Sequence, residues 1–290
     1  MKKSIYVLSV ITMSLIVIFA AVLKDTRITQ KENLQYLEKE NTTITVPELK
    51  NGRAVILELP TQEYILIDCG SSSDFSTLYE ILRGLGTDFI DAVVFTSDSL
   101  SCSGGLEKLI GNFKIGDIYI SSKAVSGKRY AEINRIARQT KTNINLCDEG
   151  SRIYDFEDIF IDVVSSEKCT LPDGKYSVIS LYLTHNDNAV FIQGDSDFAA
   201  ETGITQTMAE SIKSDMYIVP NCAEDITCGF KMAECISPFY AVIPMHSDRE
   251  PSDKVMDTLD SFGINTYRTD QCGTVLFYSN GKDIKVKRER

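Results

Sequence analysis

The chain has 290 residues, of which 43% are hydrophobic, and its formal net charge is -11. This composition supplies enough apolar side chains for a folded domain and excludes an intrinsically disordered chain. The acidic excess argues against a broad nucleic-acid-binding face, because phosphates are bound by clustered Lys and Arg. The basic cluster near the end of the sequence, Lys285, Lys287, Arg288 and Arg290, is expected to be a solvated tail.

The sequence begins with a pattern typical of a membrane anchor. Lys2 and Lys3 precede an apolar run over residues 5–23, which is long enough to cross the hydrocarbon core as a helix. A cleaved signal peptide is the alternative, but no convincing A-x-A cleavage site follows. We therefore predict a transmembrane signal anchor over 1–24, a polar stalk over 25–43 and a folded domain over 44–290. The paired lysines favour a single-pass protein of the cell membrane with this domain outside the cytoplasm.

Strand and helix patterns alternate through the rest of the chain. Apolar runs bounded by turn residues predict strands at 54–59, 64–68, 91–95, 117–120, 159–164, 177–183, 189–193, 216–219, 241–243, 266–268, 274–278 and 284–286. Helical spacing of apolar residues predicts helices at 74–82, 128–138, 198–212 and 253–262. Strands interleaved with helices in both halves favour an α/β protein, an αββα sandwich of two sheets with helices outside.

The segment from Thr96 to Gly105 carries the most specific pattern. It follows an apolar strand and resembles the T-H-x-H-x-D-H-x-G-G loop of the metallo-β-lactamase-fold superfamily, with Thr96, Gly104 and Gly105 in place. The four positions that hold metal ligands in that pattern are Ser97, Ser99, Ser101 and Cys102. Zinc is held by imidazole, thiolate or carboxylate, so neutral serine hydroxyls do not rebuild such a site.

Further blocks occur in the family order and resemble the hydrolase-like domain at the end of the DNA-internalisation competence protein ComEC. The stretch with Asp68 resembles I-D-T-G, the one ending at Asp195 resembles L-T-G-D, and Asn221 and Cys222 stand where the family has K-V-P-H-H-G. Tyr267-Arg268-Thr269-Asp270 resembles the late Y-R-T-D. The resemblance implies a metallo-β-lactamase fold, and it implies that Asp195 alone survives of the inherited ligands.

Several readings of these residues remain open on the sequence. Asp195 is a remnant ligand or the cap of the following helix. Cys102 and Cys222, together with Asp195 and with Cys69 or Cys272, are fillers of an emptied pocket, a disulfide, or ligands of one soft ion. The eight scattered cysteines favour mostly buried free thiols, with one or two bridges as the alternative.

Two histidines limit acid-base chemistry. His185 is expected at an exposed hairpin tip, and His246 follows a strand on the side where family active sites lie, as a structural residue or, alternatively, a catalytic residue of the pocket. The serines of the loop lack a G-x-S-x-G elbow, which argues against serine catalysis.

We therefore predict a membrane-anchored pseudoenzyme, a ComEC-like protein without metal or other cofactor, that binds an unknown protein or small-molecule ligand. In this reading the degenerate site comprises Ser97, Ser99, Ser101, Cys102, Asp195, Asn221 and Cys222, with Asp68 and His246 in the pocket. The alternative is a metal-dependent hydrolase of phosphodiester or other ester bonds, with zinc or another divalent metal in a rebuilt site. A role in DNA uptake rests on the resemblance and is opposed by the acidic composition.

Overall fold

A computed structural model describes residues 41–290 of the chain, and Thr42 to Arg290 form one compact unit. The predicted membrane helix over 1–24 and most of the predicted stalk lie outside the described residues. Among the residues that are described, no helix is long and apolar enough to cross a membrane. Thr42 and Thr43, which the sequence placed in the stalk, belong to the first strand.

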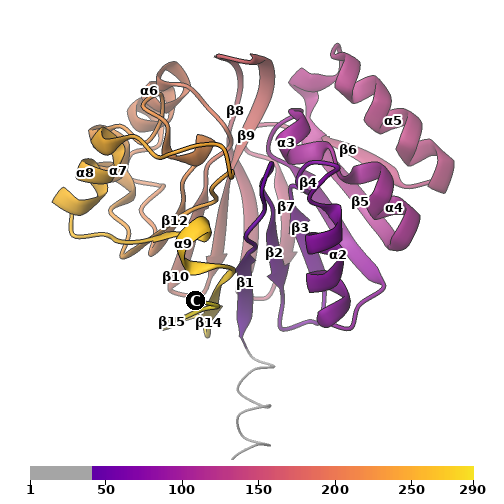
Figure 1. The fold of residues 1–290 in the computed structure, drawn as a ribbon, viewed down its shortest axis with the longest axis horizontal. Coiled ribbons are helices and arrows are strands. Elements are labelled where there is room, and N and C mark those ends of the chain that lie inside the picture. Colours follow the sequence, from indigo (N-terminus) through magenta and orange to yellow (C-terminus); the bar gives the residue numbers. More distant parts are fainter. Residues whose placement is uncertain (1–40) are drawn as a thin grey trace, which may run out of the picture. The chain divides into compact units, whose positions relative to one another are not determined.

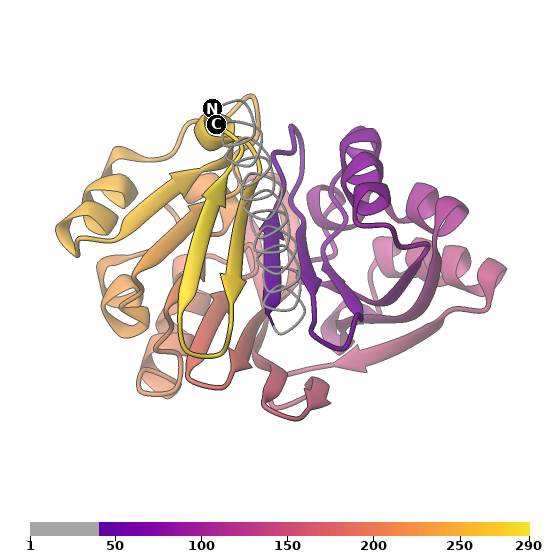
Figure 2. The same ribbon diagram turned by 90° about the horizontal axis from the view of Figure 1, so that it is seen from below.

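The first sheet has eight strands in the order β15-β14-β1-β2-β3-β4-β5-β6. From β3 to β6 neighbouring strands run parallel, and the other pairs are antiparallel. The chain therefore returns at its end to pair β14 with β1, and Figure 2 shows these two strands side by side. The strands are β1 (Thr42–Val46), β2 (Val55–Glu58), β3 (Tyr64–Ile67), β4 (Phe89–Phe95), β5 (Lys114–Ser121), β6 (Asn143–Cys147), β14 (Val275–Ser279) and β15 (Ile284–Arg288).

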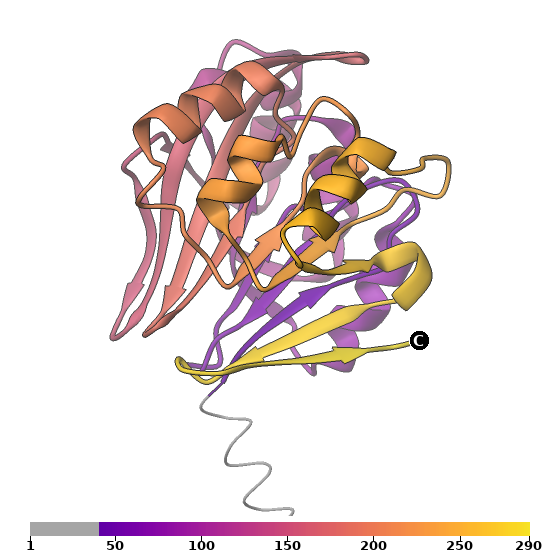
Figure 3. The same ribbon diagram turned by 90° about the vertical axis from the view of Figure 1, so that its left-hand side faces the viewer.

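The second sheet has seven strands in the order β13-β12-β11-β10-β9-β8-β7. Strands β10 to β13 run parallel, and β7 to β10 form antiparallel hairpins. The long β8–β9 hairpin extends beyond its neighbours in Figure 3. The strands are β7 (Arg152–Phe156), β8 (Ile159–Leu171), β9 (Gly174–His185), β10 (Asn188–Ile192), β11 (Met216–Ile218), β12 (Tyr240–Ile243) and β13 (Asn265–Arg268).

Helices cover the outer face of each sheet (Figure 1). The first sheet is covered by α2 (Phe75–Gly84), α4 (Leu106–Asn112) and α5 (Lys128–Thr140), and the second by α6 (Phe198–Thr207), α7 (Phe230–Ile236) and α8 (Asp253–Ser261). Two short helices, α3 (Leu100–Ser103) and α9 (Thr269–Cys272), lie in connecting loops. The predicted α/β sandwich of two sheets is confirmed.

The central strands bury both faces, which explains their continuous apolar runs. In β3, Ile65 and Ile67 enter the core between the sheets, whereas Leu66 packs under the helices. In β11, Met216 and Ile218 face the inter-sheet core, and Tyr217 faces α6 to α8. Because successive side chains of a strand point to opposite faces of the sheet, each central strand contributes side chains to two apolar layers.

The parallel strands of both sheets bring their carboxyl ends to one edge of the sandwich. The loops after β4, β10, β11 and β12 leave from this edge, which is where open α/β sheets place their ligand sites. The sequence did not predict β1, β6, β7 or α7. The three strands have only five residues each, α7 has seven, and β1 depends on pairing with β14 from the far end of the chain.

Candidate functional site

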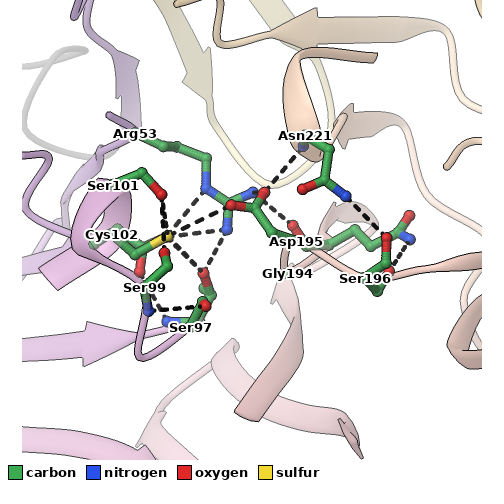
Figure 4. A network of polar contacts seen from close by, with 12 residues as sticks. Arg53, Ser97, Ser99, Ser101, Cys102, Gly194, Asp195, Ser196 and Asn221 are labelled. Atoms are coloured by element: carbon green, nitrogen blue, oxygen red, sulfur yellow. Dashed lines mark hydrogen bonds and ion pairs between the residues drawn. The ribbon is translucent and has the colours of Figure 1, made fainter. Parts of the chain in front are cut away.

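An arginine that the sequence did not single out lies at the centre of the site that the resemblance predicts. Arg53 precedes β2, and its side chain is only 4% exposed. Its Nε and Nη2 donate to Asp68 Oδ2 at 3.1 and 3.0 Å, and its Nη1 donates to the Gln193 carbonyl at 2.8 Å and lies 3.3 Å from Asp195 Oδ1. Nη2 also donates to Thr96 Oγ1. Figure 4 shows the guanidinium between Cys102 and Asp195.

The neighbours of Arg53 favour its protonated, charged form. Burial alone disfavours the guanidinium, but the carboxylates of Asp195 and Asp68 outweigh it and raise the pKa of Arg53. Burial raises the pKa of Asp68, opposed by Arg53 and by hydrogen bonds from Thr96. The Thr96 N-H donates to Asp68 Oδ1 at 2.8 Å and its hydroxyl to Oδ2 at 2.6 Å. Asp68 thus ties the end of β3 to the loop after β4.

The loop after β4 keeps the backbone of the resembled motif without its ligands. A Cβ on Gly104 would lie 2.5 Å from the Leu100 carbonyl oxygen, and one on Gly105 would lie 2.4 Å from that of Cys69, so both positions require glycine. The hydroxyls of the loop bond to one another and to the backbone: Ser97 Oγ accepts from the Ser99 N-H at 3.1 Å, and Ser99 and Ser101 share a 2.9 Å bond.

Cys102 lies at the base of this loop as a neutral thiol. Its Sγ is 3.8 Å from Asp195 Oδ2 and 4.0 Å from Thr96 Oγ1. Burial, followed by the charges of Asp68 and Asp195, raises its pKa well above the usual range. A thiol whose pKa is raised in this way is a poor nucleophile.

Asp195 does not cap the following helix, which corrects the capping interpretation. The cap of α6 is Asp197, whose carboxylate accepts from the Ala200 N-H at 3.1 Å. Asp195 instead accepts from the Asn221 N-H at 2.9 Å and pairs with Arg53. It therefore connects the loops after β10 and β11 to the guanidinium.

The segment Asn221–Ala223 has an uncommon backbone. All three residues have positive φ, at 49°, 53° and 59°, although none is glycine. Such conformations cost free energy and persist where surrounding contacts fix them, as the bond from Asn221 Nδ2 to the Ser196 carbonyl at 2.9 Å does here. Cys222 is 3% exposed, and burial raises its pKa to about 12, so it too is a neutral thiol.

The two histidines differ from each other in position. His246 follows β12 and lines the cavity at the site, and burial lowers its pKa, which favours the neutral imidazole. His185 does not lie at an exposed tip, as the sequence predicted. It is 7% exposed at the end of β9, and its Nδ1 lies 3.2 Å from Ser279 Oγ, because the β14–β15 hairpin covers it.

The cysteines settle one of the open readings. All eight are free, six of them buried, so the prediction of mostly buried free thiols is confirmed. Cys69 packs in the core under α2 and α4, and Cys272 against the inter-sheet core. Within residues 41–290, no group of three His, Cys, Asp or Glu side chains converges on a point where a metal could bind.

A cavity of about 320 Å³ opens directly above this network. Its floor includes Arg53, Ser99, Ser101 and Asp195, and Cys222 and His246 line its side. Leu171, Pro172, Asp173 and Tyr176 reach it from the β8–β9 hairpin. The structure thus brings most sequence-predicted site residues to one place, while Ser97, Asp68 and Cys102 lie buried beneath it.

The residues present do not fit the metal centre that the fold family implies. The carboxylates of Asp68 and Asp195 already accept from Arg53, and a divalent cation beside them would meet its positive charge. The neighbouring donors are neutral hydroxyls and thiols.

The signal for Arg53 in the sequence was faint: one charged residue stands directly before an apolar strand.

Comparison with known proteins gives the fold a name. No known protein-family model matches the chain. The sequence is 22% identical over 254 residues to ComE operon protein 3 of Bacillus subtilis (strain 168), a match that covers 80% of this chain and 32% of that protein. The chain thus corresponds to about a third of the length of this relative.

Solved structures at low sequence identity share the architecture. The metallo-β-lactamase fold protein YhfI from Bacillus subtilis has a TM-score of 0.56 at 12% identity, covering 85% of this chain and all of YhfI. A diphosphatase of the PhnP family has a TM-score of 0.51 at 13% identity, covering 82% and 98%. Zinc-bound PqqB from Methylobacterium extorquens has a TM-score of 0.51 at 8% identity, covering 76% and 87%. The described part of the chain has the metallo-β-lactamase fold, and its sequence is similar to part of a ComEC-like protein.

Proposed function

We propose that this protein is a membrane-anchored pseudoenzyme of the metallo-β-lactamase fold that works without metal and acts by binding a ligand in the cavity above Arg53. The observation that carries the proposal is the buried ion pair of Arg53 with Asp68 and Asp195. It places a permanent side-chain cation beside the one acidic residue that the resemblance assigns to the metals. A metal is then neither needed to neutralise these carboxylates nor favoured beside them.

The chemistry of the neighbouring groups supports binding rather than hydrolysis. Cys102 and Cys222 are thiols with raised pKa values, so neither is an activated nucleophile. Ser99 and Ser101 bond to each other, and no base among the described residues bonds to either hydroxyl. The cavity, by contrast, has the volume of a small-molecule site, and its mostly polar lining includes a few apolar side chains such as Leu171 and Ile226.

Metal content and turnover of the purified full chain test this proposal. We expect elemental analysis to find no stoichiometric transition metal, the unfolding temperature to be unchanged by EDTA, and no hydrolysis of bis(p-nitrophenyl) phosphate with added zinc or manganese. A tightly held metal, together with turnover that Asp195→Asn abolishes, would instead support the alternative, a metal-dependent hydrolase with a rebuilt site.

We further propose that residues 5–23 anchor the protein in the cell membrane, with the domain outside the cytoplasm. The support is the apolar run after Lys2 and Lys3 in the sequence. The test is fractionation followed by protease treatment of intact cells. Protein that pellets with membranes and is cleaved from outside supports the proposal, and protein released by alkaline carbonate contradicts it.

A further inference from the structure

The charges that line the cavity above Arg53 indicate what kind of ligand fits it. The lining contains two arginines, Arg53 and Arg249, and four carboxylates, Asp173, Asp195, Glu224 and Asp248. We propose that the ligand is a small organic cation bearing an amine or guanidine group. This inference rests on the proposed binding function and gives the ligand its chemical class.

Both lining cations already have partners. Arg53 is engaged by Asp68 and Asp195, and Arg249 pairs with Glu224 across the cavity wall. His246 adds no positive charge near neutral pH, because burial lowers its pKa. An anionic ligand would therefore find no uncommitted positive charge in the lining.

Two lining carboxylates form no ion pair, although the Tyr176 hydroxyl bonds to Asp173 and the charge of Arg249 acts on Asp248. Asp173 comes from the tip of the β8–β9 hairpin and Asp248 from the loop after β12, so they belong to different walls. Within the described part of the chain, no Lys, Arg or His forms an ion pair with either of them. A bound cation would gain from both carboxylates, whereas a phosphate would be repelled by them and by Asp195.

Tyr176 in the cavity lining suits the same ligand. Tyr176 lies at the boundary between this cavity and a neighbouring hollow of about 460 Å³, and it lines both together with Asp173. Aromatic faces attract amine and guanidinium cations, more strongly where water is partly excluded. Leu171, Pro172 and Ile226 add apolar contacts for the carbon chain of such a ligand.

The volume limits the ligand further. A cavity of about 320 Å³ lies at the lower end of the range for small-molecule sites. It accommodates a diamine, a polyamine or a guanidino compound. It does not accommodate a folded partner, and the lining charges disfavour a phosphodiester chain.

Titration calorimetry with putrescine, spermidine and agmatine tests the inference on the purified full chain. The uncharged diol of the same length as putrescine and inorganic phosphate are the matched probes. We expect at least one amine to bind with an affinity that falls as salt rises, and neither matched probe to bind. Because Asp173 and Asp248 are exposed at the rim, Asp173→Asn and Asp248→Asn should each weaken binding on the order of threefold.

Asp257→Asn is the control, since Asp257 is an exposed carboxylate of α8 outside the cavity lining and should leave binding unchanged. Binding of phosphate without amine binding overturns the inference, as does amine binding that the two rim variants do not weaken. If the purified protein contains no metal and none of the amines binds, the ligand class is refuted but the proposed function is not. If the protein contains a bound transition metal, the proposed function itself is refuted.

Discussion

Replacing Arg53 is the most direct perturbation of the site. Arg53→Met keeps an unbranched chain about as long as the arginine side chain up to Nε and removes the charge, which leaves the fully buried carboxylate of Asp68 without its cation. It also removes the hydrogen bonds to the Gln193 carbonyl and to Thr96. Breaking a buried ion pair on one side costs about 3–5 kcal/mol. For a domain of this size that lowers the unfolding temperature by about 6–20 °C.

The assay is urea unfolding followed by circular dichroism, with a double-mutant cycle. Arg53→Met/Asp68→Asn removes the stranded charge, so we expect it to be more stable than Arg53→Met alone, with an interaction energy of about 2 kcal/mol. The loss of unfolding free energy caused by Arg53→Met should also become smaller as pH falls, because Asp68 can then be protonated. Without Arg53 the pKa of this carboxyl rises further above its unfolded value, so the stability of the variant is lost as pH rises.

Arg152→Met is the matched control. Arg152 also pairs with two carboxylates, those of Asp155 and Asp162, but its side chain is 45% exposed, so Arg152→Met should lose much less stability than Arg53→Met. The role of Arg53 as a buried cation is refuted if Arg53→Met lowers the free energy of unfolding no more than Arg152→Met does.

Two further predictions concern the scaffold. Burial lowers the pKa of His185 from its ordinary value of 6.5, so this side chain binds a proton more readily in the unfolded chain than in the folded one. The contribution of neutral His185 to stability is therefore complete above pH 6.5 and is lost as pH falls through the folded pKa. His185→Gln should therefore lose less stability than wild type between pH 7 and pH 5 in urea unfolding, and parallel curves would contradict this. Gly105→Ala should destabilise by roughly 2 kcal/mol or more, because its Cβ meets the Cys69 carbonyl oxygen, whereas Gly111→Ala, with open space in α4, should stabilise by up to about 1 kcal/mol. Equal effects of the two substitutions in thermal unfolding would show that the loop does not require glycine.

Most of the architecture could be predicted from local patterns. Central strands such as β3 and β11 carry apolar residues toward two layers, so their runs stand out in the sequence. The glycines at 104 and 105 marked the loop because close backbone approach excludes any side chain there. The edge strands β6 and β7 lack this signal, since most of their residues are at least partly exposed.

The histidines and Asp195 show where local patterns were insufficient. His185 looked like a turn residue because Asn and Asp follow it, but β14 and β15 arrive from the far end of the chain and cover it. Asp195 looked like a helix cap because α6 begins nearby. The next aspartate, Asp197, caps that helix, and Asp195 is left free to pair across the two sheets.

The sequence by itself determined that this protein has a two-sheet sandwich and that the ligand positions of a familiar loop hold serine and cysteine. The first property follows from local periodicity, and the second from the resemblance of residues 96–105 to the metallo-β-lactamase motif. Only the tertiary structure decided which side chains meet beside that loop. Arg53 lies 15 positions from Asp68 and 142 from Asp195, and their pairing depends on two sheets aligning the ends of their strands at one edge.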